Sequence, residues 1–405
     1  GLANNQNVLA ALARVQQFEA NIDLAASGAR PVVSIGADAD LDGRREIGGD
    51  NDFSSSQGLA AALGAVLPLD VFGRTQREVE AAEAALIAAR ADMEDIVLST
   101  SAQIAAEYLQ LRGNQKQLEL LRESVALQEK TLSIVESRFK FGIAPELDMQ
   151  RAITSVENLR ADIPLLEEDL LNARNRLATL TGEFAGRYEE LLSGQKEIPA
   201  YTSPVPNIVP LAVLSRRPDV HFAEAALKQA VARAGVAEAD FYPAFELSGS
   251  LLISTVNGSG RSAVENLLFG LGAAVDQILL DGGQREARLE IARAEVDESL
   301  ADYRQVLLLA VEEVESALAA LAASQQRQEP LENALTASAR SFHQAEILYR
   351  EGLISFLDVV DAQRVLASAE QQLARARTNY AVQIAALFEA LGSDIGSEKP
   401  IAEKT

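Results

Sequence analysis

The sequence contains one pattern twice, and this duplication limits the folds that the chain can adopt. Gly142 recurs as Gly352, 210 residues later, and the same offset holds without a gap from Gly73 to Gly182. A chance agreement would not keep register over such a distance, so we expect two halves of like structure. The positions that match are Gly73, Phe139, Gly142, Leu147, Asp148, Ala152 and Gly182 in the first half and Gly283, Tyr349, Gly352, Leu357, Asp358, Ala362 and Gly392 in the second.

Composition excludes several classes of function. The chain has 405 residues, a formal net charge of −23 and no cysteine. Nucleic acids are bound by clustered Lys and Arg, so an acidic chain of this kind is not expected to bind them. Thiol catalysis and disulfides are excluded. The first methionine is Met93 and the chain opens Gly-Leu-Ala, so we expect a mature or trimmed chain.

Two segments, 31–70 and 243–280, read as β-hairpins. Apolar and polar residues alternate in each arm, which is the pattern of a strand with one apolar face. Because no run approaches the ~20 apolar residues of a spanning helix, a membrane-embedded chain would have to use these strands. A soluble hairpin with one buried face is the alternative. The apolar sets are Val33, Ile35, Ala37, Ala39 and Leu41; Leu59, Ala61, Leu63, Ala65, Leu67 and Leu69; Phe245, Leu247, Leu251 and Ile253; and Leu267, Phe269, Leu271, Ala273 and Val275.

A long helix is predicted after each hairpin, over 72–140 and 283–350. The first range contains no proline and, beyond Gly73 at its start, one glycine, Gly113, and the second carries apolar residues at the 3- and 4-residue steps of a coiled-coil seam. Pro330 is expected to bend or interrupt the second helix. A tight turn and a return helix follow in each half, and the return helices are predicted over 147–181 and 357–391.

The predicted elements divide the chain into two repeats and two extra segments. The first repeat covers 1–182 and the second covers 207–392, and each contains a helix, a hairpin, a long helix and a return helix. Residues 183–206, with Pro199, Pro204 and Pro206, form a connector, and 393–405 form a C-terminal tail.

Four strands cannot close a barrel, and open strand edges are not viable in lipid. Three chains would supply twelve strands, an even number within the known range. The predicted fold is therefore mainly α with membrane β, internally duplicated, with a long antiparallel α-helical barrel. Each chain contributes four strands to a trimeric 12-stranded β-barrel. Long apolar seams without a partner in one chain point to the same assembly.

The segment from Arg216-Arg217-Pro218-Asp219 through Ala223-Glu224-Ala225 to Phe241-Tyr242-Pro243 carries a resemblance to a known family. Together with the junctions Leu69–Arg74 and Leu280–Gly283, it resembles the outer membrane factors, the TolC-like exit ducts of Gram-negative efflux and type I secretion systems. The likeness covers nearly the whole chain and is strongest for the branch that serves RND-type pumps.

This resemblance implies a homotrimer in the outer membrane that extends into the periplasm and performs no catalysis. It implies as partners a periplasmic adaptor (membrane fusion) protein, an inner-membrane RND-type pump and outer-membrane lipid, and it implies no cofactor. The chain departs from the family in its lack of tryptophan and in a thin aromatic girdle of Phe72, Phe241 and Tyr242. The lipid-anchored N-terminal cysteine of many relatives is absent, either because it was trimmed or because this chain never had one.

The two helix turns are the best candidate site. The resemblance implies that they form the periplasmic end of the tube. Tyr349, Leu357, Asp358 and Asp361 match positions that constrict relatives. Three copies of Asp361, with or without Asp358, would ring a narrow opening and attract cations. The alternative for Asp358 is that it caps its helix.

The same turns can also dock the adaptor, because an exposed apolar patch commonly marks a contact surface. Packing between neighbouring turns is the alternative. The candidate docking residues are Gly142, Ile143, Ala144, Pro145, Leu147, Gly352, Leu353, Ile354 and Ser355.

The predicted function is passive conduction of small molecules from the adaptor and pump to the exterior. A type I secretion duct, a metal-efflux duct and a soluble periplasmic coiled-coil scaffold are the alternatives. No nucleophile, metal or phosphate-binding constellation supports an enzyme, and His221 and His343 are far apart in the sequence.

Overall fold

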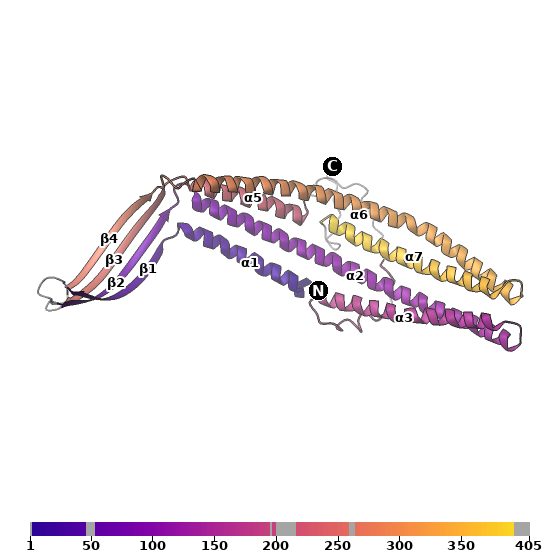
Figure 1. Cartoon of the computed structure of the whole chain (residues 1–405). Helices are drawn as coiled ribbons and strands as arrows, with labels where there is room; N and C mark the ends of the chain where they lie inside the picture. Colours follow the sequence, from indigo (N-terminus) through magenta and orange to yellow (C-terminus); the bar gives the residue numbers. More distant parts are fainter. Residues whose placement is uncertain (1, 46–52, 195–196, 200–215, 259–263, 393–405) are drawn as a thin grey trace. The chain divides into compact units, whose positions relative to one another are not determined.

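The computed structural model describes residues 2–45, 53–194, 197–199, 216–258 and 264–392. They form two compact units. The sheet unit comprises residues 13–90 and 222–304, and the turn unit comprises 1–12, 91–221 and 305–405. Each unit thus takes parts of both sequence repeats. The elements, labelled in Figure 1, are η1 (Leu2–Asn4), α1 (Gln6–Ala26), η2 (Ser27–Ala29), β1 (Val32–Arg45), β2 (Phe53–Leu69), α2 (Arg74–Lys140), α3 (Glu146–Leu180), α5 (Pro218–Ala239), β3 (Ala244–Gly258), β4 (Val264–Asp276), α6 (Gln284–Arg350) and α7 (Phe356–Ala390).

The strands form one antiparallel sheet in the order β1-β2-β3-β4. The register aligns Ile35 with Leu63, Leu63 with Leu251, and Leu251 with Phe269. Successive side chains on a strand alternate between faces, so the four apolar sets predicted from the sequence share one face. The predicted alternation is confirmed.

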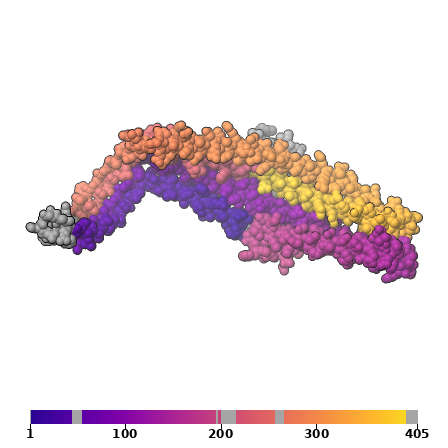
Figure 2. All heavy atoms as spheres, in the orientation of Figure 1, coloured from indigo at the N-terminus to yellow at the C-terminus, as the bar shows by residue number. Residues whose placement is uncertain are grey.

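This apolar face is not buried by the described part of the chain. Ile35 is 82% exposed, Phe269 is 85% exposed and Leu271 is 92% exposed. In the view of Figure 2, no helix of the sheet unit covers the visible face of its strands. The outer edges of β1 and β4 also pair with no other strand among the described residues. A soluble hairpin with a buried face would not leave these side chains in solvent.

Two aspartates organise the junctions between strands and long helices. A carboxylate oxygen of Asp70 accepts a hydrogen bond from the backbone N–H of Gln76 at 2.9 Å, at the start of α2. A carboxylate oxygen of Asp281 accepts from the backbone N–H of Arg285 at 3.1 Å, at the start of α6. Each satisfies a backbone donor that the first helical turn leaves unpaired. Phe72 and Tyr242 belong to the predicted aromatic girdle. Their rings stack beside the junction of β2 and α2, with centroids 4.7 Å apart.

The helices repeat the duplication of the sequence. α2 and α6 have 67 residues each, and α3 and α7 have 35 residues each. The boundaries of α6 and α7 lie 210 residues after those of α2 and α3. Of the two effects expected at Pro330, a bend or an interruption, the interruption is wrong, because α6 continues through it. A proline removes one helical hydrogen bond, and the rest of this long helix holds the segment in place. Within the described residues, no helix combines the length and apolar character needed to span a membrane.

The core of the turn unit lies along the contacts between helices, in two apolar clusters. The cluster near the turns joins Val135 of α2, Tyr349 of α6, and Phe356 and Val359 of α7. The second cluster contains Leu111 and Leu118 of α2 together with Leu170, Ala173 and Leu177 of α3. The cluster near the turns joins the ends of α2, α6 and α7 that carry the candidate site.

One glycine sets how closely two of these helices approach. A Cβ atom added to Gly113 of α2 would lie 2.4 Å from the hydroxyl oxygen and 2.5 Å from the methyl carbon of Thr378 on α7. A real Cβ cannot occupy such a position, so α7 packs against the bare backbone of α2 here. Gly113, inside the predicted 72–140 helix, therefore has a packing role.

Candidate functional site

The two helix turns have the same backbone structure, and this explains their repeated glycines. Gly142 and Gly352 adopt φ angles of 72° and 76°, which side chains with a Cβ disfavour. The N–H of Ile143 donates to the carbonyl of Arg138 at 2.8 Å, and the N–H of Leu353 donates to that of Leu348 at 2.9 Å. This pattern is a Schellman C-cap, which stops a helix and reverses the chain.

Tyr349, a predicted gate residue, lies inside the turn unit and is 7% exposed. Its ring packs against Phe356 with a centroid separation of 5.9 Å. The guanidinium of Arg138 covers the ring at 4.6 Å and donates a hydrogen bond to the Tyr349 carbonyl at 2.9 Å. Burial raises the pKa of the Tyr349 hydroxyl. Tyr349 therefore joins the ends of α2, α6 and α7.

The other three predicted gate residues lie on the first two turns of α7 and are exposed. The carboxylate of Asp358 accepts hydrogen bonds from the hydroxyl of Ser355 at 2.7 Å and its backbone N–H at 2.9 Å. These bonds, the hydroxyl first, lower the pKa of Asp358. Asp358 thus caps α7, as the alternative reading expected. Asp361 forms an ion pair with Arg364 at 2.8 Å, and Leu357 is 54% exposed.

The predicted docking residues divide into exposed and packed sets. Ile143, Leu147 and Leu353 are 64%, 56% and 67% exposed. Ala144 is half-buried, and the half-buried Ile354 packs against the cluster of Phe356 and Val359. The remaining members, Gly142, Pro145, Gly352 and Ser355, are exposed and shape the turn backbone. The turns therefore present apolar side chains to solvent in a single chain.

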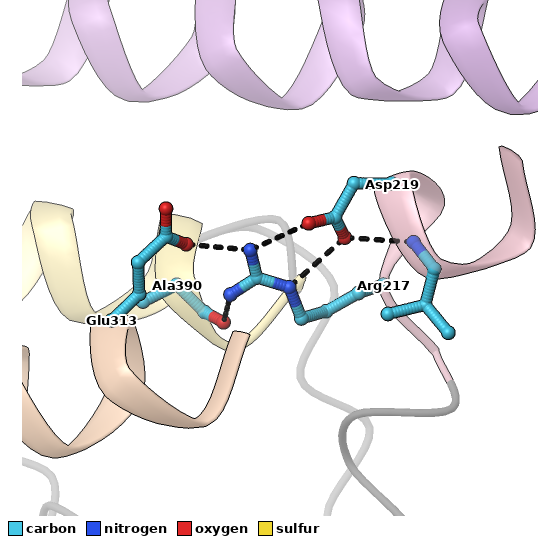
Figure 3. Close-up of polar contacts among 5 residues, drawn as sticks. Arg217, Asp219, Glu313 and Ala390 are labelled. Carbon is cyan, nitrogen blue, oxygen red and sulfur yellow. Dashed lines mark hydrogen bonds and ion pairs between the residues drawn. The ribbon is translucent and has the colours of Figure 1, made fainter. Parts of the chain in front are cut away.

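The family motif forms a polar hub elsewhere in the turn unit (Figure 3). Arg217 is 7% exposed. Its guanidinium donates to both carboxylate oxygens of Asp219 at 3.0 and 2.8 Å, to Glu313 at 2.5 Å, and to the carbonyl of Ala390 at 2.7 Å. Arg217 thereby links the start of α5, the middle of α6 and the C-terminal end of α7. Pro218 and Asp219 open α5, and the neighbouring Arg216 is exposed.

Acidic side chains surround this arginine. Burial lowers the pKa of Arg217, but its hydrogen bonds to Asp219 and Glu313 more than offset this, so the pKa is raised. The pKa of Asp95 on α2 is raised mainly by burial and, to a smaller extent, by repulsion from Asp219. The pKa of Glu389 on α7 is raised mainly by burial and, to a smaller extent, by repulsion from Asp95. One buried cation therefore serves several carboxylates.

The sequence did not single out Arg138 or Glu313 as partners in these contacts. The matching position of the second repeat holds Leu348 instead of an arginine. This difference between the repeats could have marked Arg138 as a residue with a role of its own. Glu313 lies among many acidic residues of α6, and nothing in its sequence context distinguishes it. Among the described residues, no three histidine or acidic side chains come together as possible metal ligands.

Comparison with known proteins gives consistent matches over the chain. The sequence profile described as outer membrane efflux protein matches residues 1–183 and 209–393. Nodulation protein T of Rhizobium leguminosarum bv. viciae is 30% identical over 93% of this chain and 77% of its own length. The pyoverdine export outer membrane protein OpmQ of Pseudomonas putida is 28% identical over 98% of this chain and 85% of its own length. The solved outer-membrane channel OprN is 33% identical, with a TM-score of 0.88 over 97% of this chain and 88% of its own.

Proposed function

The chain belongs to the outer membrane efflux protein family, and we propose that three copies of it form one conduit that passes small molecules out of the cell. It is an exit duct of an efflux system, it lies in the bacterial outer membrane, and it extends into the periplasm. Its family consists of channels without enzymatic activity, which confirms the expectation that it is not an enzyme. A periplasmic adaptor and an inner-membrane pump of the RND type would supply the cargo.

The observation that carries the trimer is the unburied apolar face of a four-stranded sheet with two open edges. Lipid would cover the face, and neighbouring strands would pair with the edges, because unpaired backbone groups are costly in a bilayer. Twelve strands from three chains would form a barrel of accepted size. The test is the number of chains in the detergent-solubilised particle.

The proposed constriction is the first part of α7, where Leu357, Asp358 and Asp361 are exposed. In a trimer three copies of Asp361 would meet near the axis and favour cations. Tyr349, which is buried, would act by holding the end of α6 in place. Asp358 already caps its helix, so Asp361 is the residue whose negative charge is proposed to attract cations at the constriction.

Planar-bilayer recordings in a salt gradient test this gate. We expect Asp361→Ala to reduce cation selectivity, because one carboxylate per chain is lost. Arg364→Ala should increase it, because the ion pair at 2.8 Å then no longer offsets Asp361. Unchanged conductance and selectivity in Asp361→Ala would remove the gate proposal.

The exposed turn residues Ile143 and Leu353 are the proposed contacts of the adaptor. The chain contains no cysteine, so single cysteines at these two positions give unambiguous cross-links in cells. Glu168→Cys, on an exposed position of α3, is the control. Adducts with the adaptor from positions 143 and 353 but not from 168 would support docking. Adducts only between copies of this chain would favour packing between neighbouring turns instead.

The proposed cargo is a small molecule. Support comes from the relative named as a pyoverdine export protein and from the resemblance of the motif at Arg216–Asp219 to the RND-serving branch. Deletion of the gene, followed by complementation in a strain that retains the pump, would test this. Restored export of a small molecule is expected, whereas restored export of a protein substrate alone would indicate a type I secretion duct.

A further inference from the structure

Two glutamines lie buried between helices of the turn unit, and three of their amide atoms have no hydrogen-bond partner among the described residues. Gln128 on α2 is 2% exposed and Gln363 on α7 is 5% exposed. The amide nitrogen of Gln128 and both amide atoms of Gln363 have no hydrogen-bond partner among the described residues. Buried polar atoms are nearly always paired, so three unpaired atoms in one region need an explanation.

The register of α2 and α7 places the two glutamines at the same level. The helices run antiparallel, and Thr378 of α7 lies against Gly113 of α2. Fifteen residues along α2 from Gly113 is Gln128, and fifteen residues back along α7 from Thr378 is Gln363. Because both helices rise equally per residue, equal steps keep facing positions together. The same register brings Val135 to Phe356, and these two residues share one apolar cluster.

Each glutamine lies among buried apolar residues of its helix. On α2 it lies between the buried Val125 and Val135, and on α7 it lies between Val359 and Leu373. Two other buried polar residues of α2, Gln117 and Thr131, do have partners. Gln117 accepts a hydrogen bond from Arg375 at 3.0 Å, and the hydroxyl of Thr131 bonds to a backbone carbonyl.

The contact is held firmly on both sides of this level. Toward one end are the close approach of Thr378 to Gly113 and the bond from Arg375 to Gln117. Toward the turns is the apolar cluster around Val135 and Phe356. A polar residue in a helical seam lowers stability while fixing register. Between two anchored regions, the glutamine level is therefore the place where α2 and α7 separate at least cost.

We propose that Gln128 and Gln363 form a built-in weak point in the α2–α7 contact, at which the α6–α7 hairpin parts from α2 when the duct opens. The proposal rests on the proposed function, because it assigns a means of opening to the same helices. The low local stability of the α2–α7 contact at the two glutamines can be tested separately, without recording channel currents.

Hydrogen–deuterium exchange of the full chain in detergent tests the local statement. In the unaltered protein, amides of 359–370 should exchange faster than those of 373–385. Gln128→Met with Gln363→Met removes both amides at similar volume, which is neutral or stabilising when both polar partners are replaced. We expect about tenfold slower exchange over 359–370, equivalent to about 1.4 kcal/mol. Gln344→Met, on an exposed position of α6, should change nothing.

Bilayer recordings of the same variants test the link to opening. The double variant should open less often than the unaltered protein at the same single-channel conductance. Absence of any channel in the unaltered protein would refute the proposed function. A functional channel with uniform exchange along α7, or with exchange unchanged or faster in the double variant, would overturn the weak point alone. An ordered water bonded to both amides in an experimental structure would do the same.

Discussion

The guanidinium of Arg138 lies 4.6 Å from the centre of the Tyr349 ring and donates a hydrogen bond to the carbonyl of the same residue. The contact joins the last turn of α2 to the last turn of α6. A cation over an aromatic ring contributes about 0.5–2 kcal/mol, and a hydrogen bond from a charged donor contributes about 1.5–3 kcal/mol. Arg138→Ala should therefore lower the free energy of unfolding of the turn unit by roughly 2 kcal/mol.

Denaturant titration measures this loss, and Lys140→Ala is the matched control. Lys140 also lies in the last turn of α2 but is exposed. It should cost less than about 0.5 kcal/mol, as surface substitutions commonly do. Equal effects of the two variants would show that the Arg138–Tyr349 contact contributes nothing of its own.

Gly113→Ala tests the close approach of α2 and α7. Alanine is favoured over glycine in a helix by about 1 kcal/mol, whereas overpacking costs about 1–3 kcal/mol. With the added Cβ only 2.4 Å from the hydroxyl of Thr378, we expect the clash to dominate and the thermal midpoint to fall. Thr378→Ala in the same chain should restore part of the loss. A higher midpoint in Gly113→Ala alone would mean that α7 moves aside easily.

Arg217→Ala should be much more damaging than Arg216→Ala. The first leaves the carboxylates of Asp219 and Glu313 and the carbonyl of Ala390 without their shared donor. Glu313 is more than half exposed, so solvent limits the penalty to roughly 2–3 kcal/mol. Arg216 is exposed and should change stability by less than about 0.5 kcal/mol. Similar losses for both variants, measured by chemical denaturation, would contradict the hub.

The stability of the turn unit should fall as pH rises above about 4, because burial raises the pKa values of Asp95 and Glu389 from 3.8 and 4.5. A carboxyl with a raised folded-state pKa contributes its full stability below the unfolded pKa. That stability is lost as pH rises through the folded pKa. Asp95→Asn and Glu389→Gln should each flatten the decline. Thermal midpoints across a pH series measure it.

Asp358→Asn is a control for the pH series, because the contribution of Asp358 to stability should change with pH in the opposite direction. The bonds from Ser355 lower the pKa of Asp358, so its contribution is present above the unfolded pKa and is lost as pH falls through the folded pKa. Replacing Asp358 should therefore reduce the loss of stability in acid. A pH profile unaffected by Asp95→Asn and Glu389→Gln would contradict the assigned environment of the hub.

The sequence predicted the elements of this fold well because its signals are local and repeated. Alternation identified the strands, and the paired glycines at 142 and 352 identified the turns, since only a left-handed backbone ends the helices there. The proline at 330 does not interrupt α6, because the local preference of one residue is weaker than the packing of the long helix around it. Tertiary packing overrides such a preference.

The site was less accessible from sequence because its contacts join distant segments. Arg138 meets Tyr349, and Arg217 meets Glu313, across separations that no local pattern encodes. The burial of Tyr349 likewise depends on how α2 and α7 pack around it. The capping role of Asp358 could be anticipated, because it needs only Ser355 three residues earlier.

The most direct test of the account is the mass of the purified particle in detergent by native mass spectrometry. The chain has a mass of 43.3 kDa. If three copies are needed to cover the apolar sheet and pair its two edges, the stripped particle should have three times that mass and resist dilution. A stable particle of 43.3 kDa, with the sheet intact, would contradict the account.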